Sequence, residues 1–376
     1  MTRIRGFEEV AEARRDVGVF WTQTCPSKFH SVGGTNPRYN GATPRDAQAY
    51  MVQVWARQRA ALHRAGIRPY GFRIAEPHTD GCPHWHMLLF VGREHAERME
   101  AIMRGYALAE DGDEPGADKN RVKVVRIEAG KGTAAGYIAK YVSKNIDGAG
   151  VGDHKAFESG STYIIAPDQF GNVEITPSQR VTYWSQVWGI RQFQQIGGAP
   201  VGVWRELRRV KADAIANAPD AIKAAHAACQ KIESEDPAVN KQADFGAYMI
   251  AQGGPTVARR HLAVRIAARD VTIKGRYATY EQKKPAGVYA SAFPLEVYES
   301  VRYRWTVEQK DGAGVAFDSP WTGVNNCTPP ASDGGPQWNG ETVHVKETRP
   351  ENVETFRDHS PRFARGHIHN LRRKHE

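Results

Sequence analysis

Residues 70–91 read YGFRIAEPHTDGCPHWHMLLFV, and this stretch decides the fold. It opens with YGFRIAE and closes with HWHMLLFV, which both have the aromatic and β-branched composition that is typical of strands. Between them, Thr79-Asp80-Gly81 is a strong turn sequence. The stretch therefore predicts two antiparallel strands joined by a tight connection.

The flanking sequence predicts a strand and a helix on either side of this hairpin. Residues 17–24 (VGVFWTQT) and 122–128 (VKVVRIE) have strand composition. A helix is expected between Thr43-Pro44, which reads as an N-cap with proline at the first helical position, and Gly66. Residues 93–108 predict a second helix. The order β-α-β-β-α-β is that of a split βαβ, ferredoxin-like antiparallel sheet flanked by helices, so the fold class is α+β. Residues 132–145 predict one further helix.

The remaining sequence changes character in three steps. We assign residues 1–165 to the α+β domain and residues 176–260 to a mainly helical, basic region. Residues 261–328 contain strand-like segments (LAVRI, DVTI, YESVRYRWTV) and form a small β-containing region. From residue 329 to 376, Gly, Pro, Asn and charged residues dominate, and we expect a poorly ordered basic tail.

Charge, cysteine content and hydropathy indicate which classes of protein fit this sequence. The formal charge of +9 favours an anionic partner, of which nucleic acid is the commonest. The four cysteines (Cys25, Cys82, Cys229 and Cys327) form no CxxC pair, which predicts reduced thiols rather than a zinc ribbon or a disulfide framework. Residues 1–15 are charged throughout, and no apolar run approaches the length of about 20 residues that a membrane span needs. We expect a soluble protein of the cytoplasm with no membrane partner.

The hairpin brings three metal-ligand residue types together. Residues two apart on a strand face the same side, so His84 and His86 project together. If the strands pair about the Asp80-Gly81 turn, Glu76 lies opposite them, whereas a shift of one residue would turn it away. Two imidazoles and a carboxylate can bind a divalent cation and polarise a phosphate. His78 is the alternative third ligand, and packed or surface histidines are the alternative to a metal site.

Residues 137–145 read YIAKYVSKN, a tandem Tyr-x-x-Lys motif. On a helix Tyr137 and Tyr141 share one face, with Cβ atoms about 6 Å apart. A phenol with a pKa of about 10 is a poor nucleophile at neutral pH. The ammonium groups of Lys140 and Lys144 would lower that pKa and offset negative charge in a transition state. The alternative is an amphipathic helix with half-buried tyrosines and solvated lysines.

Together the two motifs predict phosphodiester chemistry more specifically than either does alone. A metal on the sheet would polarise the scissile phosphodiester, and a tyrosine oxygen would attack phosphorus in line, leaving a phosphotyrosine and a free 3′-hydroxyl. Arg205, Arg208 and Arg209 are candidates for DNA phosphate contacts, although they could also form a solvated face. We regard His367-x-His369 as accidental, because no turn or carboxylate accompanies it.

The sequence resembles the HUH endonucleases, and among them the bacteriophage replication gene A proteins. Three blocks carry the resemblance: FWTQTCPS at residues 20–27, EPHTDGCPHWHMLLF at 76–90 and AGYIAKYVSKN at 135–145. Two further blocks, at residues 188–209 and 320–328, are also similar to that family. The resemblance covers roughly residues 17–328 and identifies residues 1–165 as an HUH endonuclease domain.

The resemblance implies a specific activity. It matches His84 and His86 to the HUH pair, Glu76 to the acidic ligand, and Tyr137 and Tyr141 to the paired tyrosines, with Tyr141 the first attacker. The implied cofactor is Mg²⁺ or Mn²⁺. The implied reaction is nicking and rejoining of single-stranded or supercoiled origin DNA through a 5′-phosphotyrosyl intermediate, which starts rolling-circle replication in a bacterial host. A host replicative helicase is a further candidate partner.

Other classes of protein share parts of this pattern. A conjugative relaxase or single-strand transposase would use the same chemistry, but the tyrosines here follow the histidine block rather than lying near the N-terminus. A histidine-triad hydrolase would need a third alternate histidine where Leu88 stands. A non-catalytic DNA-binding protein with a structural metal would not need two tyrosines on one helical face.

Overall fold

The computed structural model describes residues 2–127, 136, 177–232, 240–275, 277–302, 304–314 and 341–348. The sequence expectations for residues 132–145 fall outside this range, apart from the helical residue 136. Among the described residues, no helix combines the length and the apolar character that crossing a bilayer requires.

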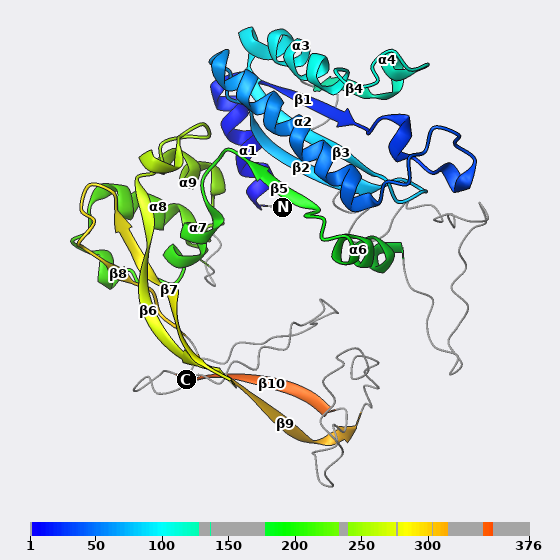
Figure 1. Ribbon diagram of the computed structural model, residues 1–376. Helices are drawn as coiled ribbons and strands as arrows, with labels where there is room; N and C mark the ends of the chain where they lie inside the picture. Colours follow the sequence, from blue (N-terminus) through cyan, green and yellow to red (C-terminus); the bar gives the residue numbers. More distant parts are fainter. Residues whose placement is uncertain are drawn as a thin grey trace.

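A five-stranded antiparallel sheet forms the centre of the first part of the chain (Figure 1). Its strands are β1 (Asp16–Gln23), β2 (Tyr70–Pro77), β3 (Pro83–Gly92), β4 (Val122–Ile127) and β5 (Phe193–Ile196). The order is β4-β1-β3-β2-β5, and every neighbouring pair is antiparallel. The order β4-β1-β3-β2 is that of the split βαβ arrangement, so the expected α+β class is confirmed.

Helices α2 (Pro44–Arg64) and α3 (Ala96–Ala107) cover one face of this sheet. Helix α2 begins as its sequence predicts, because Thr43 and Asp46 form a reciprocal capping box ahead of the first turn. On this face Trp21, Trp85 and Met87 are fully buried against the two helices. Arg73 also lies on this side, with its guanidinium carbon 4.0 Å from the centre of the Trp85 ring.

The opposite face packs on α1 (Thr2–Arg14), a helix that the sequence analysis did not anticipate. Phe7, Val10 and Ala11 recur at helical spacing among charged residues and bury against the sheet. The same apolar core continues into a helical part of the chain. That part comprises α6 (Pro177–Val187), α7 (Val201–Leu207), α8 (Asp220–Cys229) and α9 (Phe245–Ala251). Of these, α7, α8 and α9 contribute to the core around α1.

Strand β5 is a short strand within the region 176–260, which the sequence predicts to be mainly helical. Residues 193–196 pair with β2 and complete the sheet at its edge. The polar sequence FQQI gave no alternating pattern, and the strand forms because β2 has an open edge for it. The neighbouring Gly71 of β2 has φ +152, and a Cβ there would overlap the carbonyl oxygen of Leu88. Glycine is therefore required where β2 is held between two strands.

The rest of the described chain forms two smaller sheets. Strands β6 (Val264–Lys274), β7 (Thr279–Ala290) and β8 (Tyr298–Glu299) form one, and the long β6–β7 ribbon leads away from the helices (Figure 1). The expected segments LAVRI and DVTI thus fall largely on a single strand. Strands β9 (Arg304–Gly314) and β10 (Glu341–Thr348) form the other. Strand β10 lies within residues 329–376, for which the sequence predicts a poorly ordered tail; outside residues 341–348 that segment is not described, and the expectation stays a prediction.

Candidate active site

The β2–β3 hairpin sets the geometry of the site. Glu76 is paired directly with His84, and Ile74 is paired with His86. Directly opposed residues of antiparallel strands project from the same face, so Glu76, His84 and His86 lie together on the face that α1 partly covers. The connecting turn places Gly81 at φ +81 and is closed by the hydrogen bond from the His78 amide to the Cys82 carbonyl, 2.8 Å.

The three side chains converge at their polar atoms. Nε2 of His84 and Nε2 of His86 are 2.7 Å apart. Oε2 of Glu76 lies 3.8 Å from Nε2 of His84 and 3.5 Å from Nε2 of His86. Among the described residues, this is the one group of three or more His, Cys, Asp or Glu whose candidate ligand atoms all lie within 4.8 Å of one another. Two nitrogens and one carboxylate oxygen form a donor set that fits a divalent cation.

Strand β1 fixes the orientation of His86. Thr22 is paired with His86, and its Oγ1 lies 3.0 Å from Nδ1 of that histidine. The ring of Phe20, two residues earlier on β1, stacks on the His86 ring with centroids 5.7 Å apart. These contacts turn Nε2, the other ring nitrogen, toward Glu76. Both residues lie in the sequence block 20–27, but only the strand register shows which histidine they contact.

The side chains of Glu76 and His86 are 4% and 8% exposed, and that of His84 is 13% exposed. The protein therefore shields Glu76 and His86 from solvent, and His84 is the most accessible of the three side chains. His78, the alternative ligand, lies against His84 with ring centroids 4.1 Å apart, but it does not belong to the group of three converging atoms. The geometry brings together Glu76 rather than His78 with the two strand histidines.

Tyr137, Lys140, Tyr141 and Lys144 lie outside the described residues, as do His367 and His369. Their expected roles remain predictions from the sequence.

The arginines at the end of α7 are all exposed, but they differ in their surroundings. Nη1 of Arg209 lies 3.1 Å from Oε1 of Glu206, a buried carboxylate that Arg302 and Ser300 also contact. Burial lowers the pKa of Arg3 of α1, and the charge of Arg205 lowers that pKa further. Arg3 lies over the ring of Phe72 at 5.8 Å. Sequence reasoning missed Arg3, because nothing in its local pattern connects it with residue 205.

The three described cysteines are free and buried, as the expectation of reduced thiols requires. Cys25 and Cys82 nevertheless come together in space, and both Sγ atoms approach the carbonyl oxygen of Pro83, at 3.7 and 3.9 Å. Burial and the neighbouring Cys25 raise the pKa of the Cys82 thiol.

Fold and site together define an α+β protein whose antiparallel sheet presents a buried two-histidine, one-glutamate cluster at the end of a hairpin. Residues 1–149 match the family of the bacteriophage replication gene A protein (GPA). This part of the chain belongs to that family, as the resemblance of its sequence blocks predicts.

Curated relatives agree with this assignment. The chain is 40% identical to the replication gene A protein of Escherichia phage 186, with 89% of this chain and 47% of that protein covered. It is 36% identical to the "Probable replication protein P12" of Pseudoalteromonas phage PM2, over 89% of this chain and 48% of the relative. It is 33% identical to a "Probable replication endonuclease from prophage-like region" of Salmonella paratyphi A, over 88% of this chain and 41% of the relative. The chain thus spans about half the length of these relatives. No solved structure matches it.

Proposed function

We propose that this chain is a site-specific single-strand DNA endonuclease and ligase that initiates rolling-circle replication. The observation that carries the proposal is the convergence of Glu76, His84 and His86 in a chain of the replication gene A family. The relatives named as replication proteins and as a replication endonuclease support DNA as the substrate.

Glu76, His84 and His86 would hold the metal, which we propose to be Mg²⁺ or Mn²⁺. The donor set is the observation that supports this: two imidazole nitrogens and one carboxylate leave coordination positions open for phosphate oxygens. A bound divalent cation would supply Lewis-acid polarisation of the scissile phosphodiester. The protein would contribute the orientation of the ligands, with Thr22 and Phe20 holding His86 and the strand register holding Glu76 beside it.

Tyr137 and Tyr141 are the proposed nucleophiles, on the basis of the sequence motif. The phenol oxygen forms a bond to phosphorus, and the bond from phosphorus to the 3′ oxygen breaks. The phenol proton ends on the leaving oxygen, so the products are a 5′-phosphotyrosyl strand and a free 3′-hydroxyl. Reversal of the same step rejoins a strand without a further energy source. Lys140 and Lys144 would favour the phenolate and offset charge on the phosphate.

Arg205, Arg208 and Arg209 are proposed to contact DNA phosphates, and Arg3 of α1, whose pKa the charge of Arg205 lowers, would extend this basic surface. The proposed partners are single-stranded or supercoiled origin DNA and a host replicative helicase. The reaction would then take place in the cytoplasm of a bacterial host.

Incubation of the purified chain with end-labelled single-stranded origin DNA and Mn²⁺ tests the proposal. A band of protein with attached DNA that survives denaturing electrophoresis, together with a free 3′-hydroxyl that a polymerase extends, is the expected result. Sequencing of the adduct would locate the cut. DNA binding without any adduct or cleavage would instead identify a non-catalytic DNA-binding protein.

A further inference from the structure

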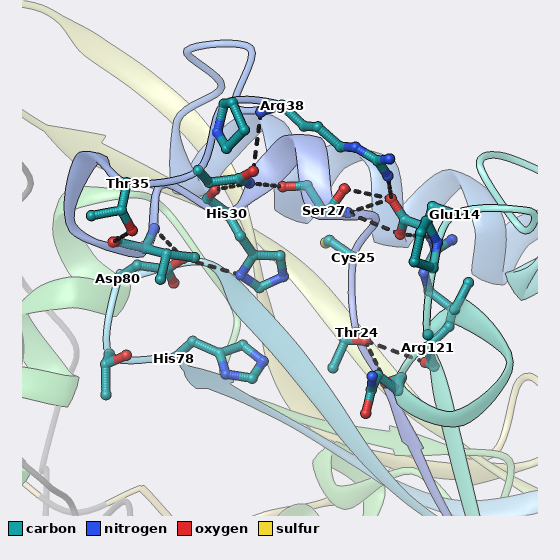
Figure 2. Close-up of a pocket in the computed structure, with 18 residues that line it drawn as sticks. Thr24, Cys25, Ser27, His30, Thr35, Arg38, His78, Asp80, Glu114 and Arg121 are labelled. Carbon is teal, nitrogen blue, oxygen red and sulfur yellow. Dashed lines mark hydrogen bonds and ion pairs between the residues drawn. The ribbon is translucent and has the colours of Figure 1, made fainter.

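A cavity of about 850 Å³ (Figure 2) borders the candidate metal cluster, because its lining includes His78, whose ring lies 4.1 Å from that of His84. Three loops line this open cavity: residues 24–38 after β1, residues 78–80 between β2 and β3, and residues 114–121 before β4. All three join the sheet at the end where Glu76 and His84 lie. The volume falls within the range of about 300–1,000 Å³ that is common for ligand-binding pockets.

A histidine held by a buried aspartate projects into this cavity. Nδ1 of His30 lies 3.1 Å from Oδ2 of Asp80, whose side chain is only 5% exposed. The backbone amides of Cys82 and Val32 donate to the same carboxylate, at 3.0 and 3.4 Å. Burial raises the pKa of Asp80, but the hydrogen bonds from His30 and the two amides outweigh it and hold that pKa below its usual value. A charged Asp80 accepts a hydrogen bond from Nδ1 of His30, and Nε2 can then donate to a ligand when the ring is the doubly protonated imidazolium.

Glu114 stabilises the opposite wall of the cavity. Its carboxylate accepts hydrogen bonds from the Ser27 amide at 3.1 Å and from the Ser27 hydroxyl, and Arg121 donates to it at 2.5 Å. Arg38, at the rim, lies 3.7 Å from the same carboxylate and is about half exposed. The charge of Glu114 is therefore balanced within the wall. The loops are tied to each other, so the cavity is formed before any ligand binds.

A row of imidazole rings connects the cavity to the candidate metal cluster. The ring of His30 meets that of His78 nearly edge-on with centroids 5.1 Å apart, and His78 lies against His84 at 4.1 Å. In Figure 2 His30 and His78 enter the cavity from the same side. A strand whose phosphate sits at the cluster would therefore place an adjoining nucleotide at the mouth of the cavity.

The chemistry of the lining favours a nucleotide over a second metal ion. His30, His78 and Asp80 do not converge as the cluster residues do, since among the described residues no second group brings three ligand atoms within 4.8 Å. The walls combine apolar groups, from Val32, Pro37 and Ala117, with imidazole rings and the guanidinium of Arg38. Flat apolar surfaces and rings suit the faces of a base, and an imidazole donor with a nearby guanidinium suits a phosphate.

We propose that this cavity binds one nucleotide of the DNA strand next to the scissile phosphate, with the imidazolium form of His30 donating a hydrogen bond from Nε2 to its phosphate and Asp80 positioning His30 through Nδ1. The inference rests on the proposed function for the identity of the strand. It assigns to the loop after β1 a role in holding substrate that is separate from the metal ligands and the tyrosines.

Photo-crosslinking in EDTA tests this without requiring cleavage. An oligothymidylate in which the thymines are replaced by 4-thiothymine is bound to the wild-type chain, irradiated and mapped by mass spectrometry. Crosslinks to peptides containing residues 24–38 or 78–80 are expected. Crosslinks confined to other parts of the chain would overturn the proposal. So would equal labelling of the same peptides by free 4-thiothymidine 5′-phosphate, which would indicate a mononucleotide site.

Binding variants provide the second arm, measured by anisotropy with the same oligothymidylate in EDTA. His30→Gln should weaken binding about tenfold, the equivalent of one charge-assisted hydrogen bond. Asp80→Asn should weaken it less, because His30 is retained but no longer held. His95→Gln is the matched control, since that histidine is 42% exposed and lies outside the cavity lining. Equal affinities for His30→Gln and His95→Gln, with the folded circular dichroism spectrum retained, would contradict the assignment. Failure of the wild-type chain to form an adduct with Mn²⁺ would remove the proposed function but leave these binding results standing.

Discussion

The hydroxyl of Thr22 lies 3.0 Å from Nδ1 of His86, across the β1–β3 ladder. If Nε2 of His86 is a metal ligand, Nδ1 carries the proton and donates a hydrogen bond to the oxygen of this hydroxyl. Partners of this kind hold the ring in place and raise the basicity of the ligand nitrogen. Thr22 is thus positioned to tune the affinity for metal without touching the ion.

Replacement of Thr22 tests this role. Thr22→Val keeps the shape of the side chain and removes the acceptor, so the affinity for Mn²⁺ should fall by about 10–100-fold. Thr22→Ser retains the hydroxyl and should bind Mn²⁺ nearly as the wild type does. Titration calorimetry measures both. An unchanged dissociation constant for Thr22→Val would show that the hydroxyl does not support a metal ligand.

Loss of the two strand histidines should separate catalysis from DNA binding. His84→Ala with His86→Ala, or chelation by EDTA, should abolish nicking. Salt-sensitive DNA binding should remain, because phosphate neutralisation by Lys and Arg does not need the metal. A nicking gel and a filter-binding assay measure the two properties, with His95→Ala as the control. Full cleavage in excess EDTA would refute metal dependence.

Removal of the phenol oxygens should separate the roles of the two tyrosines. The double variant Tyr137→Phe, Tyr141→Phe should form no covalent adduct with labelled DNA. At least one single variant should still nick but fail in the second transesterification that releases a circle, with Tyr141 expected to attack first. Denaturing gels and circle-release assays follow the two steps. Normal nicking by the double variant would point to a water nucleophile.

The arginines near the end of α7 should contribute unequally to DNA affinity. Replacing Arg205, Arg208 and Arg209 together by Gln should reduce the slope of log K against log salt. The reduction should correspond to the loss of up to about three phosphate contacts. Because Arg209 is paired with Glu206, the variant with only Arg205 and Arg208 replaced should account for most of that change. Binding titrations over a range of salt concentrations measure the slopes. An unchanged slope in the triple variant would identify a solvated face.

Glu206 should make the fold sensitive to acid. Burial raises its pKa, but hydrogen bonds from Arg302 and Ser300 outweigh this and lower the pKa below the ordinary value of 4.5. A lowered pKa in the folded state stabilises the protein above the unfolded pKa, and this stabilisation is lost as the pH falls through the folded value.

Glu206→Gln should therefore lower the free energy of unfolding by about 1–3 kcal/mol at neutral pH. The difference from wild type should shrink below a pH of about 4. Urea titrations at several pH values measure it, with Glu97→Gln as the control because that side chain is 87% exposed. A difference that does not depend on pH would exclude the ion pair as its cause.

The sequence predicted local relationships well and distant ones poorly. Glu76 and His84 could be placed opposite each other because a short turn limits the register of a hairpin. Helix α1 was missed because its few apolar residues are dispersed among charges. The pairing of β5 with β2 joins residues more than a hundred positions apart, and no local pattern records such a partner. Thr22, His30 and Asp80 acquire their roles only when separate strands and loops meet. The predicted tyrosines lie outside the described residues and are not tested.

The pairing of β5 with β2 has a practical consequence for anyone who divides the chain. A fragment that stops at residue 165 retains the cluster but lacks β5, so the backbone amides and carbonyls of β2 from Gly71 to Ile74 lose their partners along one side. Such a bare edge offers a template for intermolecular strand addition and aggregation. The same truncation removes α7 and α9, which cover Phe7 on the apolar face. A fragment that ends at residue 165 would therefore expose both the β2 edge and the apolar face around Phe7.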